Sequence, residues 1–260
     1  MAQLCREFLR YHALRSKLGS VRGGDGVEAA WAHSLLAVNN GTYLSGEVLR
    51  VDDLRSRCRA AAADAAPHGL PWLFFIYEPL VSAELIPRID NVLAEEGFNR
   101  AGGLREMAAA AHALATPVRP LPDVACRRIA TEEDRLAALH LNCLGYGMPL
   151  EIGTSVIETG SYYSDAATEF GFIALVEGQP VSTASVLVVD ESLYVEAVAT
   201  APAHQKRGYA EAVMRHAISE ASAATGLTAT YLDASAAGCP LYRQMGYGSL
   251  ADWRYYVAAG

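Results

Sequence analysis

The sequence has little of what marks a secreted or membrane-bound protein. Its five cysteines are widely spaced and include no Cys-x-x-Cys pair, so we expect neither a disulfide framework nor a zinc site. No apolar run approaches the ~20 residues that span a bilayer. The first residues show no basic segment followed by a long apolar one, so we expect no signal peptide. Free thiols favour a cytoplasmic protein. Since no apolar run is long enough, we expect no membrane as partner.

Basic residues are also scarce. Lysine and arginine number 21 against 29 aspartates and glutamates, which gives a net charge of −8. A general nucleic-acid binder would normally show the opposite balance, so we expect no nucleic-acid partner. What the chain does contain is apolar: 52% of residues are hydrophobic and 19% charged, which excludes disorder and allows a sizeable core. Its 260 residues fit one large domain or two small ones.

A proline-rich stretch favours two domains. Pro117, Pro120 and Pro122 lie close together, and prolines at this density favour an extended connector over a helix. We therefore predict domains at 1–115 and 124–260, with a linker at 116–123.

The first half reads as a mixture of helices and strands. Apolar spacing predicts helices from Leu4 and over 27–36, and a third from Ser82 to Glu96. The apolar run 72–77 predicts a strand buried on both faces.

The second half predicts strands, then a helix, then strands. Short apolar segments separated by turn residues predict three strands, at 170–177, 180–189 and 193–200. Apolar residues at 3.6-residue spacing predict a helix that follows Gly208 and ends at Gly226. We therefore expect an α/β fold with a mixed sheet.

The most informative segment lies where the third of these strands gives way to the helix. The turn holds Lys206, Arg207 and Gly208, and Lys206 is one of only two lysines in the chain. Free amides and the dipole at a helix start favour a pyrophosphate, and glycine allows the backbone to come close. The glycines of a Walker or dinucleotide loop are missing. An ordinary strand-to-helix turn remains the alternative.

Two motifs together resemble the GNAT N-acetyltransferase superfamily. Gln205-x-x-Gly208-x-Ala210 is similar to that family's acyl-CoA loop, [Q/R]-x-x-G-x-[G/A]. The segment 232–247, a strand, a loop, a short helix with a tyrosine and then Gly-Tyr, resembles the end of the family's fold. The resemblance covers about 124–257 and implies the GNAT acyl-CoA N-acyltransferase fold.

The first half ends in a similar order of strand, helix, glycine, aromatic residue and strand. Glu96-Gly97-Phe98 compares with Met245-Gly246-Tyr247, but the first half has no acyl-CoA loop pattern. Its Asp52 and Asp53 would repel a pyrophosphate. We therefore expect two tandem GNAT-like domains, the first of them a degenerate or accessory domain without cofactor.

The resemblance implies an acyl-CoA site made largely of backbone groups. The pantetheine arm would follow Val198, Ala199 and Thr200. The pyrophosphate would be held by the loop and helix start, with Ser235 beside the pantetheine and adenine. The loop residues are Gln205, Lys206, Arg207, Gly208, Tyr209, Ala210 and Glu211.

Tyr242 matches the family tyrosine that protonates the departing CoA thiolate. A phenol suits this step because a thiolate with a pKa of about 8.5 is a comparable base. A packed aromatic side chain is the alternative interpretation.

Glu196 is the candidate general base by its place on the strand before the loop. A glutamate hydrogen-bonded across the sheet is the alternative, and a water relay from Glu169 or Tyr194 would also serve.

Other residues have simpler explanations. We interpret His204 as a turn residue, and Cys143 and Cys239 as packing residues rather than nucleophiles. Tyr146, Tyr162 and Tyr163 would line the acceptor pocket or be interfacial tyrosines.

The predicted function is an N-acetyltransferase that moves an acetyl group from acetyl-CoA, as co-substrate, to a primary amine in a ternary complex. No metal is implied. The acceptor is a small-molecule amine or a protein amine. One alternative is an acyl-CoA-binding sensor or scaffold protein that has lost catalysis. Another is an acyltransferase with a different acyl group or a hydroxyl acceptor. The oligomeric state stays open, with a homodimer among the options.

Overall fold

The computed structural model describes residues 4–160, 162 and 165–259. The chain forms two units, and each is described by itself. Unit 1 is Met1–Glu106 with Leu250–Gly260, and unit 2 is Met107–Ser249. Two units agree in number with the two predicted domains, but the division differs. The last strand pairs with unit 1, and the predicted linker 116–123 lies inside unit 2.

Unit 1 is built on a mixed sheet in the order β1-β2-β3-β4-β11-β5. Pairs β1·β2 and β2·β3 are antiparallel, β3·β4 is parallel, and β4·β11 is antiparallel. The strands are β1 (Ser20–Gly24), β2 (Val27–Trp31), β3 (Asn40–Leu44), β4 (Leu73–Tyr77), β5 (Phe98–Ala110) and β11 (Gly248–Ala258).

Helices cover both faces of this sheet. Successive strand residues point to opposite faces, and on β2 Glu28 pairs with Arg10 of α1 while Ala29 and Trp31 pack with Ala65 of α2. The helices are α1 (Leu4–Arg15), α2 (Val51–Ala65) and α3 (Ile89–Glu95), with short 3-10 helices at Ala37–Asn39, Glu78–Leu80 and Ile86–Arg88.

Two sequence predictions for unit 1 were wrong, each for its own reason. Residues 27–31 form a strand rather than the start of a helix. The prediction failed because all five residues are buried, so the sequence shows no alternation of polar and apolar residues that would indicate a strand. The helix predicted from Ser82 begins only at Ile89. Pro87 in the preceding 3-10 turn offers no amide hydrogen to a longer helix.

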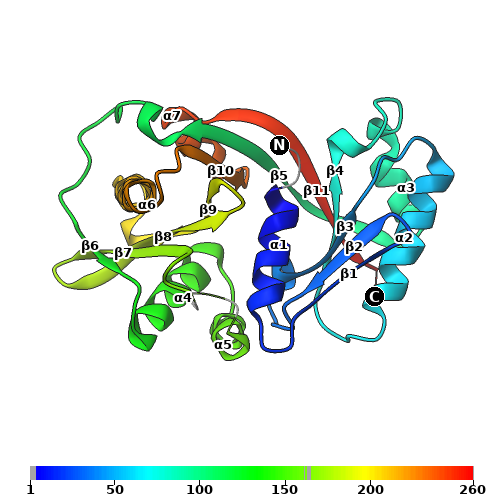
Figure 1. The fold of residues 1–260 in the computed structure, drawn as a ribbon, viewed down its shortest axis with the longest axis horizontal. Helices are drawn as coiled ribbons and strands as arrows, with labels where there is room; N and C mark the ends of the chain where they lie inside the picture. Colours follow the sequence, from blue (N-terminus) through cyan, green and yellow to red (C-terminus); the bar gives the residue numbers. More distant parts are fainter. Residues whose placement is uncertain (1–3, 161, 163–164, 260) are drawn as a thin grey trace. The chain divides into compact units, whose positions relative to one another are not determined.

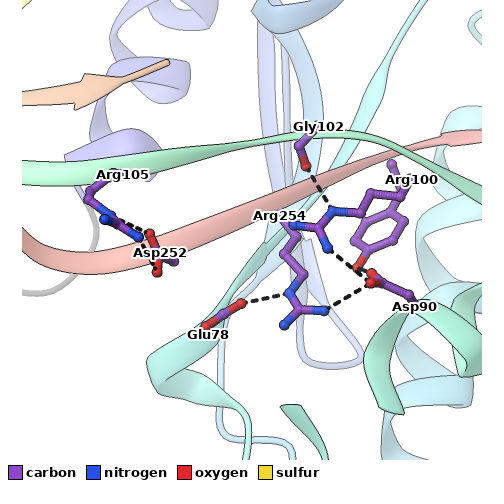
Figure 2. Close-up of polar contacts among 8 residues, drawn as sticks. Glu78, Asp90, Arg100, Gly102, Arg105, Asp252 and Arg254 are labelled. Carbon is purple, nitrogen blue, oxygen red and sulfur yellow. Dashed lines mark hydrogen bonds and ion pairs between the residues drawn. The ribbon is translucent and has the colours of Figure 1, made fainter. Parts of the chain in front are cut away.

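Charged side chains connect the 3-10 helix after β4 with α3, β5 and β11 within unit 1. Figure 2 shows Arg254 reaching both Glu78 and Asp90, with Nε–Oε1 at 2.6 Å and Nη1–Oδ2 at 3.2 Å. Arg100 donates to the same Asp90 carboxylate at 2.9 Å, and Tyr256 to its other oxygen. Asp90 is thereby held between two arginines at the start of α3.

Unit 2 has a similar order of pairings with one further antiparallel pair before the parallel one. Its strands run β5-β10-β9-β8-β7-β6, with β6·β7, β7·β8 and β8·β9 antiparallel and β9·β10 parallel. As in unit 1, a helix connects the parallel pair. Besides the last residues of β5, the strands are β6 (Ala125–Arg128), β7 (Glu169–Val176), β8 (Gln179–Val189), β9 (Ser192–Thr200) and β10 (Ala229–Ala234).

The helices of unit 2 lie on both faces of its sheet. Figure 1 shows α6 on one side of β7, β8 and β9, and α4 and α5 on the other, and α6 and α4 both pack on β8 and β9. The helices are α4 (Glu132–Tyr146), α5 (Leu150–Thr159), α6 (Tyr209–Thr225) and α7 (Cys239–Gln244), with 3-10 helices at Ala111–Ala113 and Pro202–His204.

The predicted order of the second half is confirmed. Strands β7, β8 and β9, the helix that follows Gly208 and the strand after it all occur at the expected places. The apolar side chains predicted to face inward from α6 are buried among Val186, Val195 and Leu232. This arrangement brings the end of β9 and the start of α6 together.

Candidate functional site

The parallel pair β9·β10 separates before β9 ends. Pairing stops at Leu232 and Val195, whereas β9 continues to Thr200. Near this point β9 bulges: residues 197 and 198 together lie opposite Ala184, and Ala197 has a φ of 50°. The bulge and the separation leave the β10 side of the end of β9 unpaired within the described residues.

The loop after β9 turns sharply into α6. Lys206 has a φ of 62° and Gly208 a φ of 88°, both left-handed. Residues in alternating left- and right-handed conformations point successive amides toward one spot and form an anion-binding concavity. Gln205 stabilises the turn rather than pointing its amide at the concavity. Its side chain donates to the Thr200 carbonyl at 3.3 Å, and its amide donates to the Pro202 carbonyl at 3.4 Å.

The amino end of α6 is open to an anion. Within the described part of the chain, no side chain caps this end, and Gly208 is the cap residue. The first helical residues, Tyr209, Ala210 and Glu211, carry the amides that a helix leaves unsatisfied. The Glu211 carboxylate is paired with Arg215 at 2.8 Å, so its charge is neutralised beside the positive end of the helix.

The proline-rich stretch borders this loop, which the sequence did not reveal. Arg119 donates to the Lys206 carbonyl at 3.1 Å. A Cβ atom on Gly208 would lie 3.0 Å from Cδ of Pro122. A lone arginine among prolines gives no signal of this contact, because it depends on the return of the chain about 87 residues later.

Tyr242 lies half-buried on the short helix α7. Its ring is 6.1 Å from that of Tyr247 in an edge arrangement. Burial, followed by the neighbouring Tyr146, Tyr247 and Cys239, raises the pKa of Tyr242 above its ordinary value. The phenol is therefore protonated at neutral pH, as a proton donor must be.

Tyr146, at the end of α4, also belongs to this site. Its hydroxyl donates to the Val198 carbonyl at 3.0 Å. Burial of the hydroxyl and then the charge of Glu196 raise its pKa to about 12, although 55% of the residue surface is exposed. The structure thus brings Tyr146 within electrostatic reach of both predicted catalytic residues, Glu196 and Tyr242.

Glu196 is buried at the bulge of β9, with 8% of its surface exposed. The two relay candidates, Tyr194 and Glu169, each take part in a hydrogen bond with another residue. Tyr194 donates to Asp233 at 2.9 Å, and the Glu169 carboxylate accepts from the Asp165 amide at 3.3 Å. Glu196 itself lies on β9 one residue beyond Val195, the last residue of β9 that pairs with β10.

Ser235 and Cys239 shape the loop before α7. The Ser235 hydroxyl and carbonyl accept hydrogen bonds from the Gly238 amide, at 3.2 and 3.0 Å. Cys239 is partly buried against the core of unit 2. Its thiol and those of Cys58, Cys126 and Cys143 are free, whereas the side chain of Cys5 lies outside the described part.

The other candidate residues have mainly packing environments. Cys143 is buried against α5, where a Cβ on Gly153 would lie 2.8 Å from its sulfur. His204 is half-buried near the Tyr209 ring. Tyr162 is buried, and Tyr163 lies outside the described residues.

In unit 1 the parallel strands do not stay separated at the corresponding position. Its parallel strands β3 and β4 are joined again beyond their ends, where Val48 and Val81 form a bridge. The Val48 amide donates to Leu80 at 2.7 Å, and the Ser82 amide donates to Val48 at 3.0 Å. At the start of α2 the Asp53 carboxylate caps the helix: it accepts from the Arg50 amide at 3.1 Å and pairs with the Arg50 guanidinium at 3.2 Å, so this helix start is already occupied.

Unit 1 has no tyrosine at the position that corresponds to Tyr242. Tyr242 stands four residues before Gly246, and four residues before Gly97 stands Leu93, which is fully buried. Unit 1 thus has a sheet similar to that of unit 2 but lacks the features of the site.

The described residues offer no group of three or more histidine, cysteine, aspartate and glutamate side chains that could hold a metal ion. Among the same residues, no helix combines the length and apolar character needed to cross a membrane.

Comparison with known proteins agrees with this geometry. Residues 148–247 match the model of the Acetyltransferase (GNAT) family. A GCN5-related N-acetyltransferase from Kribbella flavida has a TM-score of 0.72 and 16% identity, over 100% of this chain and 97% of its own. A GCN5-related N-acetyltransferase from Sphaerobacter thermophilus has a TM-score of 0.62 and 15% identity, over 89% of this chain and 76% of its own.

A tandem GNAT protein from the clavulanic acid biosynthesis pathway has a TM-score of 0.58 and 11% identity, over 98% of this chain and 95% of its own. No curated protein matches the chain. At these identities the solved structures show the fold, which is the GNAT fold over the whole chain, as predicted.

Proposed function

We propose that unit 2 transfers an acetyl group from acetyl-CoA to a primary amine by direct transfer in a ternary complex, and the match of residues 148–247 to the Acetyltransferase (GNAT) family supports this. One observation carries the proposal. The separated, bulged end of β9 runs directly into the left-handed loop and the uncapped start of α6. The first offers backbone groups to a pantetheine arm, and the second offers amides and cations to a pyrophosphate.

The catalytic roles follow from position. Acetyl-CoA supplies an activated acyl group as its thioester. Glu196 would accept the proton of the attacking amine, because a protonated amine cannot attack a thioester. Tyr242, protonated at neutral pH, would donate to the departing thiolate.

Unit 1 would act as an accessory domain without acyl-CoA. The Val48–Val81 bridge, the Asp53 carboxylate and Leu93 support this role, since each removes one feature that the site in unit 2 has. The acceptor is a small-molecule or protein amine, and the net charge of −8 is compatible with a cationic one.

The test has two stages. Calorimetric titration with acetyl-CoA measures binding, and release of free thiol with a panel of amines measures transfer. Binding with turnover of at least one amine is the expected result. Binding without turnover over a broad panel would favour a sensor or scaffold protein, turnover only with hydroxyl acceptors would favour O-acylation, and no binding would refute the proposal.

A further inference from the structure

The hydrogen bond from Tyr146 to Val198 occupies an unusual place. Val198 follows Ala197 in the β9 bulge, where the ladder to β8 is interrupted and pairing with β10 has already ended. A carbonyl in such a position is available to a ligand. Here it accepts a hydrogen bond from the hydroxyl of Tyr146 at 3.0 Å.

The end of α4 is held firmly against β9. A Cβ on Gly145 would lie 2.9 Å from the Cβ of Ala199 and 3.5 Å from the Thr200 amide nitrogen. Gly147 ends the helix in the left-handed conformation, with its amide on the Cys143 carbonyl. The helix therefore brings Tyr146 to the bulge, and its ring can move only by side-chain rotation.

The same carbonyl is expected to bind the pantetheine arm. The proposed acyl-CoA site uses backbone groups of Val198 and Thr200, and a pantetheine amide hydrogen would need the acceptor that Tyr146 now uses. Tyrosine and ligand thus compete for one group.

We propose that Tyr146 is a reversible cap on the Val198 carbonyl, which the pantetheine arm of acyl-CoA displaces. The inference rests on the proposed acyl-CoA site. The displaced hydroxyl can turn to solvent, because 55% of the Tyr146 surface is exposed. Binding of acyl-CoA then moves the Tyr146 hydroxyl away from the backbone of β9.

Burial, followed by the charge of Glu196, raises the pKa of Tyr146 to about 12. The hydroxyl therefore keeps its proton at neutral pH and stays a donor to the Val198 carbonyl until a ligand replaces it.

The test compares two probes on Tyr146→Phe. Coenzyme A carries the pantetheine arm, whereas adenosine 3′-phosphate 5′-diphosphate is the same nucleotide without it. The variant no longer has a hydrogen bond to break, so coenzyme A should bind about three- to tenfold more tightly, the equivalent of one net protein hydrogen bond. The nucleotide should bind as it does to the wild type, and this also reports that the site is folded. Tyr255→Phe, the same change in unit 1, is the control.

Each other outcome decides against the inference. Unchanged or weaker binding of coenzyme A, with nucleotide binding intact, overturns it. An equal change for both probes also overturns it, because the effect would then come from the phosphate loop. If the wild type binds neither probe, the proposed function itself fails, and this result is distinguishable from the first two.

Discussion

Gly208 and Pro122 are packed so closely that a Cβ atom on the glycine would lie 3.0 Å from Cδ of the proline. The proline belongs to the stretch predicted as a linker, and the glycine starts the proposed phosphate loop. The stretch therefore packs directly against the loop, and a side chain at position 208 would crowd Pro122 and strain the backbone.

Gly208→Ala should weaken acetyl-CoA binding and stability together. The φ of 88° costs an alanine about 1–2 kcal/mol, and the new methyl group presses on Pro122. We expect acetyl-CoA affinity to fall about tenfold or more, measured by calorimetry. Gly178→Ala has the matched strain, a φ of 78°, with open space around it. Equal loss of affinity in both variants would contradict a local role of Gly208.

Tyr242→Phe should slow transfer without weakening binding. Removal of a general acid typically costs a factor of 10²–10⁴, so we expect kcat to fall about a hundredfold in a thiol-release assay while the Kd for acetyl-CoA stays the same. An unchanged rate and pH profile would assign Tyr242 a packing role only.

Glu196→Gln should reduce the rate most at neutral pH. Without the base, only the small fraction of amine that is already deprotonated can react, and this fraction grows as the pH approaches ~10. We expect a loss of about a hundredfold at pH 7 that shrinks steadily with rising pH. Glu191→Gln, at the exposed turn before β9, is the control. A rate profile equal to that of the wild type would place the base elsewhere.

Arg254→Met should destabilise unit 1. The Arg254 side chain is only 12% exposed, and its loss leaves the carboxylates of Glu78 and Asp90 with less compensation. We expect a loss of about 3 kcal/mol in the free energy of unfolding, measured in urea. Arg100→Met removes another ion pair with Asp90. Because the Arg100 side chain is 45% exposed, this change should lower the free energy of unfolding by under about 1 kcal/mol. Comparable losses would show that burial does not decide the strength of these pairs.

His68 should make unit 1 sensitive to acid. It stacks on Trp31 with ring centroids 3.8 Å apart, and burial, followed by His33, lowers its pKa below the ordinary 6.5. The folded state thus favours the neutral ring. This contribution to stability is complete above pH 6.5 and is lost as the pH falls below it.

Unfolding in urea between pH 8 and pH 5 tests this sign. The free energy of unfolding should fall less steeply with acid for His68→Gln than for the wild type. His140→Gln, an exposed histidine on α4, should leave the slope unchanged. A steeper fall in His68→Gln would reverse the assignment.

Local signals explain why so much of unit 2 could be predicted. The strands β7, β8 and β9 are separated by turn residues, and Gly208 begins a helix whose apolar residues repeat at helical spacing. These patterns need no distant partner. The helix expected at 27–36 failed for the opposite reason: β2 is a strand because β1 and β3 pair with it and helices cover both its faces.

Contacts between distant residues stayed hidden. The final strand pairs with β4, Trp253 opposite Tyr77, so the two units do not divide at the prolines. Tyr146 looked like one of three tyrosines of equal standing. Its contact with Val198 depends on how closely α4 approaches β9, which depends on Gly145 and Ala199 together.

The Val48–Val81 bridge also bears on stoichiometry. Two units with similar sheets would suggest two ligand molecules for each chain. Because a pair of backbone hydrogen bonds joins β3 and β4 again just beyond their ends, a titration should saturate at one acyl-CoA for each chain.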